Sequence, residues 1–448
     1  MKTQNSLPDY VTKYLSKYGT DGWKVSPSRE PIYSNIVVIP AINEYNNIRT
    51  LLSSLSSLDN NYFNSTLFLF CINNTSSSPD EVKNDNFKTI ALLKKVAGRK
   101  TGDDDLINYV INSKINLAYI DAATDGNELP EKDGGVGLAR KIGLDNALKV
   151  FDYDSSNKKI LIFLDSDCTV ERNYLTEIVN SFSGSDISAA VVNFSHNYDD
   201  NETSRAIIPY EIFLRYYVMG LRSAGSPYAF HSIGSTIVCT AESYIKAEGM
   251  SKRKAAEDFY FLQKMSKFTR IANIKGTTVH PSSRKSWRVP FGTGQRVNRF
   301  FAGTHDEYVL YDPDSFFMLK EWLNLFNKMS SAQAGKILSE AKNINPHLHT
   351  FLEDQNFERD WNKIIKNSKS TEQIDKQRSF WFDGFRTLKL IHYLRDKSFP
   401  MINMFDALDL LLTEFGADNP RRSKTGLPGL EVQKDYLNIL READLNSA

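Results

Sequence analysis

The stretch Ile160-Leu-Ile-Phe-Leu164-Asp165-Ser166-Asp167 decides the fold prediction. Five consecutive apolar side chains predict a strand that is buried on both faces, as in a parallel sheet. Two carboxylates separated by one residue follow this strand directly. Because ligands of such sheets bind at the carboxyl ends of the strands, we expect the chemistry of the protein here. Carboxylate oxygens at this spacing can share a hard divalent cation with diphosphate oxygens.

The same residues allow other interpretations. An Asp pair after a strand also occurs in a turn whose carboxylates cap the next helix. In addition, Asp165-Ser-Asp167-Cys-Thr169 is similar to the signature of haloacid-dehalogenase phosphatases, in which Asp165 would be the nucleophile. That family places its motif on the first strand and needs a later Lys and a later acidic pair. Here the motif follows the fourth expected strand, and no convincing acidic motif of the phosphatase type follows a later strand, so the phosphatase is the alternative hypothesis.

Apolar runs and helical periodicity alternate on both sides of this stretch. We expect strands at 36–39, 67–72, 115–120, 160–164, 189–194 and 235–239, and helices at 48–58, 87–96, 136–151, 204–220 and 241–248. This order predicts an α/β fold with a Rossmann-like, doubly wound, mostly parallel sheet. After Phe300 the strand signals fade, and helices such as 316–328 and 378–394 are expected. The predicted organisation is a leader at 1–34, an α/β domain at 35–303 and a helical region at 304–448.

Composition excludes several classes of protein. The chain has 448 residues, 41% of them hydrophobic and 24% charged, as expected for a folded protein. A formal net charge of +1 gives no argument for nucleic acid or an anionic membrane as a partner. The three cysteines show no CxxC spacing, which argues against a zinc site or a disulfide framework. Neither a signal peptide nor an apolar run of about 20 residues is present, so a cytoplasmic location without an integral membrane segment is expected.

Five segments, taken in order from Ile36 to Phe300, resemble the motifs of family 2 glycosyltransferases with the GT-A fold. They are the opening Val37-Val-Ile-Pro40-Ala-Ile-Asn43-Glu44, the helix start Gly137-Leu-Ala-Arg140-Lys-Ile-Gly143, the metal motif Asp165-Ser-Asp167, the acidic pair in Ala256-Glu257-Asp258, and Arg296-Val-Asn-Arg299-Phe300, with Phe where the family has Trp. Each motif alone is weak evidence, but their shared order is specific.

The resemblance implies an inverting transferase that moves a sugar from a UDP- or GDP-sugar to an acceptor hydroxyl. Asp258 would be the general base, and Mn²⁺ or Mg²⁺ would be held by Asp165, Asp167 and His280. His280 can equally be a loop histidine that is hydrogen-bonded to the backbone. The donor would contact Pro40, Asn43, Glu44, Asn73, Arg140, Asp165 and Ser235. Residues that could contact the acceptor or the diphosphate are Glu257, Arg284, Arg288, Arg296 and Arg299.

The chain also departs from the family. Asn73 and Asn74 stand where an acidic residue often contacts the nucleotide base, and since Asn both donates and accepts, the choice of base stays open. The Arg296 and Arg299 motif belongs mainly to membrane-embedded synthases, and a solvated helix face explains these arginines equally well. His231 is expected to pack in a core. The acceptor and the oligomeric state stay open, and a non-catalytic sugar-nucleotide-binding protein is a further hypothesis.

Overall fold

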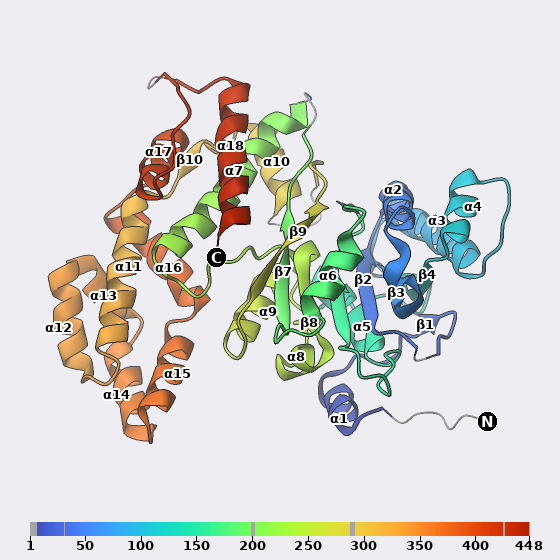
Figure 1. The fold of residues 1–448 in the computed structure, drawn as a ribbon, viewed down its shortest axis with the longest axis horizontal. Helices are drawn as coiled ribbons and strands as arrows, with labels where there is room; N and C mark the ends of the chain where they lie inside the picture. The colour runs from blue at the N-terminus through green and yellow to red at the C-terminus, as the bar shows by residue number, and fades with distance from the viewer. Residues whose placement is uncertain (1–6, 31, 199–201, 287–291, 424–425, 448) are drawn as a thin grey trace. The chain divides into compact units, whose positions relative to one another are not determined.

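The computed structural model describes residues 7–30, 32–198, 202–286, 292–423 and 426–447. The chain forms two compact units (Figure 1). The first contains Met1–Asn197 and Ser232–Gln295, and the second contains Tyr198–His231 and Arg296–Ala448. The sequence analysis expects one break near residue 303. The second unit begins a few residues earlier, and it also takes in residues 198–231, because the helix in that segment packs into the helical core.

A nine-stranded sheet, in the order β1-β4-β3-β2-β5-β8-β7-β9-β6, organises the first unit. The neighbouring pairs β4–β3, β3–β2 and β2–β5 are parallel, whereas β8 runs antiparallel to β5 and β7. The prediction of an α/β fold with a mostly parallel sheet is therefore confirmed. The strands are β1 Val25–Ser26, β2 Asn35–Ala41, β3 Thr66–Asn73, β4 Asn116–Ala122, β5 Ile160–Phe163, β6 Thr169–Val170, β7 Ala189–Phe194, β8 Ile237–Thr240 and β9 Ala272–His280.

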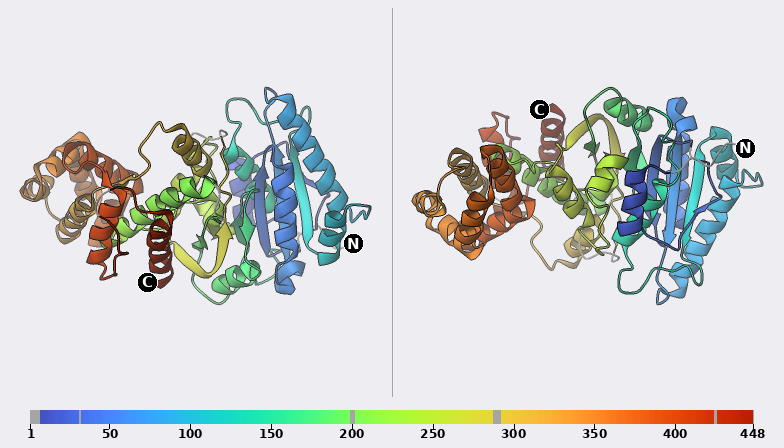
Figure 2. Two further views of the ribbon diagram at one scale, coloured as in Figure 1. Left: turned by 90° about the horizontal axis from the view of Figure 1, so that it is seen from above. Right: turned by 90° about the horizontal axis from the view of Figure 1, so that it is seen from below.

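Helices lie on both faces of this sheet (Figure 2). Residues of α2, α3, α4 and α6 share one core with alternate residues of β2 and β3. On the opposite face α5 lies so close to β2 that a Cβ at Gly143 would overlap the Val38 side chain. The helices of this unit are α1 Asp9–Tyr18, α2 Tyr45–Ser56, α3 Asp80–Ala97, α4 Asp105–Ser113, α5 Val136–Ala147, α6 Tyr174–Phe182, α8 Ala241–Lys246 and α9 Glu257–Ser266, with short 3-10 helices at Asn60–Ser65 and Gly234–Thr236.

The expected leader is an integral part of the first unit. The Tyr14 hydroxyl of α1 donates to Asp145 Oδ1 of α5 over 2.8 Å, and the Thr20 amide donates to the other oxygen over 3.0 Å. Asp145 is fully buried and also pairs with Lys141 one turn earlier at 3.1 Å. Because an unpaired buried carboxylate is costly, these donors hold α1 against α5.

The second unit is helical, as the sequence predicts for this region. Its elements are α7 Glu202–Ser223, α10 Thr293–Ala302 at the boundary of the units, α11 Pro313–Lys328, α12 Ala334–Ile344, α13 Pro346–Asp354, α14 Phe357–Asn367, α15 Thr371–Trp381, α16 Gly384–Lys397, α17 Met404–Glu414 and α18 Leu430–Asn446, with a two-residue strand pair of β10 Val309–Leu310 and β11 Ile402–Asn403. The prediction of a single helix at 378–394 is wrong. Helix α15 ends at Trp381 and α16 begins at Gly384, where the Asp383 side chain caps the new helix by accepting a hydrogen bond from the Arg386 amide.

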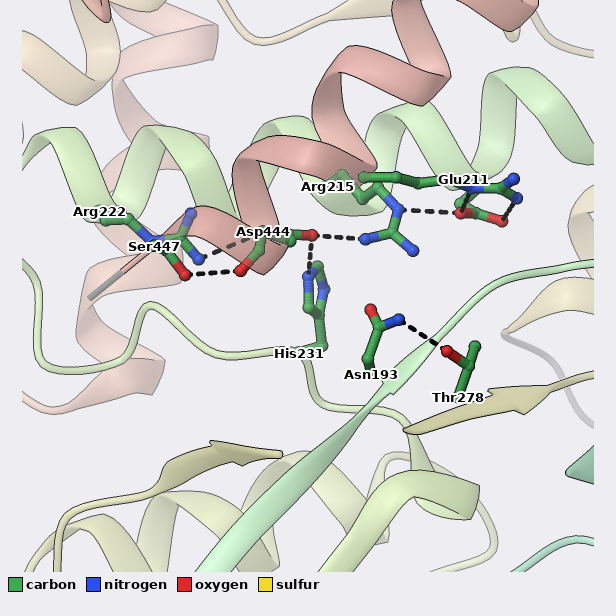
Figure 3. Close-up of polar contacts among 9 residues, drawn as sticks. Asn193, Glu211, Arg215, Arg222, His231, Thr278, Asp444 and Ser447 are labelled. Atoms are coloured by element: carbon green, nitrogen blue, oxygen red, sulfur yellow. Dashed lines mark hydrogen bonds and ion pairs between the residues drawn. The ribbon is translucent and has the colours of Figure 1, made fainter. Parts of the chain in front are cut away.

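A buried ionic network joins α7 and α18 in this unit (Figure 3). Asp444 Oδ2 lies 2.6 Å from Arg215 Nη1 and 2.9 Å from His231 Nε2. Burial opposes the charged form of Asp444, but hydrogen bonding and charge from His231 and Arg215 lower its pKa to about 2. His231 is therefore a partner of Asp444 in this ionic network, whereas the sequence predicts that it packs in a core. Across the described residues, no helix is both long enough and apolar enough to span a bilayer.

Candidate active site

Asp165 and Asp167 follow β5 and lie at the carboxyl edge of the sheet. The apolar run that precedes them predicts this position. The side chain of each acid meets a guanidinium group. Arg140 Nη2 donates to Asp165 Oδ1, and Arg284 Nη2 donates to Asp167 Oδ2 over 2.9 Å. Desolvation raises the pKa of Asp167, and the charges of Glu44 and Asp165 raise it further.

Arg140 connects two segments that are far apart in the sequence. It lies on α5 and is 4% exposed, and its second terminal nitrogen donates to Glu257 Oε1 at the start of α9. Burial alone would lower the pKa of this guanidinium, but the charges of Asp165, Glu257 and Asp258 hold it above its ordinary value. Arg140 therefore carries a permanent charge that holds the end of β5 beside α9.

Glu257 and Asp258 form the first turn of α9, which follows Ala256 in a left-handed conformation with φ of 58°. Glu257 is buried against Arg140, whereas Asp258 Oδ1 accepts from the Phe259 amide over 2.7 Å. Burial, and then the charge of Glu257, raise the pKa of Asp258 to about 6, against an opposing effect of Arg140. Asp258 therefore changes its charge near neutral pH, as a general base requires.

Glu44 joins the same group of charges from the start of α2. It is 4% exposed, and its Oε1 accepts from Arg284 Nη2, so Arg284 spans Glu44 and Asp167. Among the described residues, five carboxylates (Glu44, Asp165, Asp167, Glu257 and Asp258) meet two guanidinium groups, which leaves three negative charges in excess when all are ionised. A site with this excess favours cations.

The donor set fits a hard divalent cation in part. Within the described residues, no group of three or more His, Cys, Asp or Glu side chains is arranged to hold a metal. Asp165 and Asp167 each use one oxygen for an arginine, and their second oxygens accept no hydrogen bond from the described part of the chain. Two carboxylate oxygens suit Mg²⁺ or Mn²⁺ when phosphate oxygens and water complete the coordination.

His280 ends β9 and pairs with Thr169 across the sheet. Its Nδ1 lies 2.9 Å from the carbonyl oxygen of Ser195, and its Nε2 lies 2.8 Å from Glu171 Oε1. Each ring nitrogen therefore lies within hydrogen-bond distance of an oxygen atom. Metal binding through Nε2 of His280 would require this nitrogen to leave Glu171. The ligand role of His280 stays a prediction.

The predicted base pocket is a network of amides. The Asn73 amide donates to Ala41 O over 2.9 Å, and Asn86 of α3 donates to Asn73 O over 2.9 Å. Asn86 Oδ1 accepts from the Asn43 amide, which stabilises the left-handed conformation of Asn43, with φ of 55°. Asn86 therefore ties the end of β2 to that of β3. The sequence does not single out Asn86, which directly precedes the helix expected at 87–96, and only the sheet topology places it here.

The remaining predicted residues separate into three groups. Pro40 is buried within β2, and Ser235 is buried beside the Cys168 thiol, to which it contributes a hydrogen bond. Arg296 and Arg299 belong to the second unit, where Arg299 Nη2 lies 3.1 Å from Glu307 Oε1 and Arg296 pairs with Glu307 Oε2. Arg288 lies outside the described residues.

The fold and the site define an α/β protein with an acidic, arginine-braced site at the carboxyl edge of its sheet. A scan of family models and a search of curated proteins return no match. Among solved structures, TarS 1-349 from S. aureus in complex with UDP-GlcNAc is 14% identical, with 79% of this chain and 91% of that chain covered and a TM-score of 0.39. The mannosyltransferase PcManGT from Pyrobaculum calidifontis, in complex with GDP-Man and Mn2+, is 12% identical, with coverage of 86% and 91% and a TM-score of 0.35.

Glucosyl-3-phosphoglycerate synthase from Mycobacterium tuberculosis, in complex with Mn2+, UDP and phosphoglyceric acid, is also similar. Its identity is 16%, 55% of this chain and 70% of that chain are covered, and the TM-score is 0.28. These enzymes belong to the class that the sequence motifs resemble. At such TM-scores we draw no conclusion about the activity of this chain from them.

Proposed function

We propose that the protein is a metal-dependent, inverting glycosyltransferase that uses a UDP- or GDP-sugar. A single observation carries the proposal. Arg140 bridges Asp165, the carboxylate proposed to bind the metal, and Glu257 at the start of α9, although these two residues are about ninety positions apart in the sequence. The residues proposed to bind the donor phosphates are thus adjacent to the proposed general base. The motifs that resemble family 2 enzymes supply the same residues in the same roles.

In this mechanism, Asp165 and Asp167 would hold Mn²⁺ or Mg²⁺ at the donor diphosphate, and the cation would stabilise the charge of the departing diphosphate. Asp258 accepts the proton of the acceptor hydroxyl while that oxygen forms a bond to the anomeric carbon of the sugar. The bond between the anomeric carbon and the diphosphate oxygen breaks in the same displacement. Arg284 orients the phosphates, and Asn43, Glu44 and Asn73 line the pocket for the base and the ribose.

The proposal is tested by the products and their stereochemistry. Purified protein is incubated with UDP- and GDP-sugars, with Mn²⁺ or Mg²⁺ and with a panel of acceptors, and the anomeric configuration of the product is read by NMR. An inverted glycoside supports the proposal. Retention of configuration would contradict the inverting mechanism. Binding of donor without transfer or donor hydrolysis would indicate a non-catalytic protein, and a beryllofluoride adduct on Asp165 would favour the phosphatase.

A further inference from the structure

Three consecutive cations precede the acidic pair of α9. Lys252, Arg253 and Lys254, here named the basic triplet, are all exposed. Within the described part of the chain none of them forms an ion pair with a carboxylate, so their charge is not neutralised. Because the whole chain has a formal net charge of only +1, these three adjacent cations form a local concentration of positive charge.

Two of these side chains contact neighbouring residues. The Arg253 guanidinium lies 4.0 Å from the centre of the Tyr260 ring, and Lys254 Nζ donates to the Glu131 carbonyl oxygen over 3.0 Å. Stacking on an aromatic face leaves the guanidinium N–H groups free to donate in the plane of the group. The cations are therefore partly ordered before any ligand binds, which lowers the entropic cost of binding an anion.

The triplet lies at the same edge of the sheet as the acidic site. Its backbone packs on the glycine-rich start of α5, where a Cβ at Gly135 would lie 3.3 Å from Lys254 Cα and one at Gly137 would lie 2.8 Å from Ser251 O. Since α5 follows the parallel strand β4, its start faces the carboxyl edge. Arg140, one turn along α5, contacts Glu257, which follows the triplet by three residues.

We propose that the basic triplet binds a phosphate group of the acceptor substrate; this inference rests on the glycosyl transfer proposed above. The acidic site repels an anionic acceptor, so such an acceptor needs a separate group of cations next to the base. Arg253 can donate two parallel hydrogen bonds to phosphate oxygens, and the two lysines add charge without demanding one geometry. The basic triplet is distinct from Arg284, whose guanidinium group donates to Asp167 of the proposed donor site.

The test is direct binding of a phosphate polymer to the full chain. Fluorescein-labelled linear polyphosphate, at nanomolar concentration so that it sequesters little metal, is titrated with protein in saturating UDP and MnCl₂, and its anisotropy is measured. We expect the Lys252→Ser, Arg253→Ser, Lys254→Ser variant to raise the Kd for polyphosphate by about 10-fold or more, whereas its Kd for UDP stays within about twofold.

A matched control removes three cations from the opposite edge of the sheet. Lys95, Arg99 and Lys100 are exposed at the end of α3, and their replacement by serine should change polyphosphate binding by less than about twofold. Equal weakening in both triple variants, or no binding by the unaltered protein, would overturn the proposal. Equally tight binding of labelled polyglutamate would overturn the phosphate assignment. If the unaltered protein did not bind UDP, that result would instead contradict the proposed function.

Discussion

Gly234 makes room for the guanidinium group of Arg140. A Cβ at position 234 would lie 2.5 Å from Arg140 Nη1 and 2.7 Å from Cζ, which is closer than real atoms approach. Because Arg140 is buried and braced by Asp165 and Glu257, a movement of its guanidinium group away from position 234 would disturb both ion pairs. The absence of a side chain at position 234 is therefore a requirement of the arginine bridge.

Gly234→Ala should consequently displace Arg140 and reduce transfer by about 10²-fold, because misplacement of the reacting groups by 1 Å has this effect. The measurement is single-turnover transfer, with thermal unfolding recorded in parallel. Gly102→Ala is the matched control, since a Cβ there meets no atom within 4 Å. If Gly234→Ala transferred sugar at the rate of Gly102→Ala, the bridge would have no role in catalysis.

Asp258→Asn should keep donor affinity and lose transfer by roughly 10²-fold or more, the usual contribution of a general base. Single-turnover transfer and separate donor binding distinguish the two effects. Glu257→Gln should be milder because it retains a hydrogen-bonding oxygen beside Arg140. Near-normal transfer by Asp258→Asn would exclude the assigned base.

The pH dependence follows from the raised pKa of Asp258. Activity should fall as the pH drops through about 6, where the base becomes protonated. The charge of Glu257 raises the pKa of Asp258, so Glu257→Gln should move the acid limb of kcat/KM to lower pH. The measurement is the pH dependence of kcat/KM for both proteins between about pH 4.5 and 9, a range chosen for the usual pKa values of carboxyl groups and active-site groups. An unmoved limb would show that another group controls it.

The same pKa makes a prediction about stability. The folded-state pKa of about 6 exceeds the ordinary aspartate value of 3.8, so the folded protein binds the proton more tightly than the unfolded chain does. The contribution of Asp258 to the free energy of unfolding should therefore decrease as the pH rises from about 4 to about 6. Asp258→Asn should unfold at a higher temperature than the unaltered protein at pH 8, and calorimetry at pH 4 should find that advantage reduced.

Asp167→Ala should abolish metal-enhanced nucleotide binding and leave the fold intact. The reason is that Asp167 is one of the two carboxylates proposed to hold the metal, and it keeps one oxygen beyond its bonds to Arg284. Calorimetric titration of UDP and GDP, with and without MnCl₂, measures the effect. Asp125→Ala, an exposed acid after β4, is the control. Undiminished Mn²⁺-dependent binding by Asp167→Ala would remove Asp167 from the metal site.

The sequence predicts the sheet well because strands such as Ile160–Phe163 are continuous apolar runs, and the order of motifs brings Asp165, Arg140 and Asp258 to one edge. It does not predict which partners these side chains choose. The bridge from Arg140 to Glu257 joins positions 117 residues apart and depends on how β8 enters the sheet. Local patterns carry no information about such a pairing, and the same holds for α7, whose partners α11 and α18 begin about ninety and about two hundred residues after it ends.

The discontinuous second unit has a consequence for the order in which the chain emerges from the ribosome. The apolar residues of α7, such as Ile208 and Ile212, are synthesised before every other helix of their core. The last of these helices, α18, supplies the Asp444 carboxylate that pairs with the buried Arg215. Arg215 pairs with Glu211 of its own helix, but the Asp444 carboxylate follows only after more than two hundred further residues have been synthesised. The core of the second unit can therefore be completed only after α18 has left the ribosome.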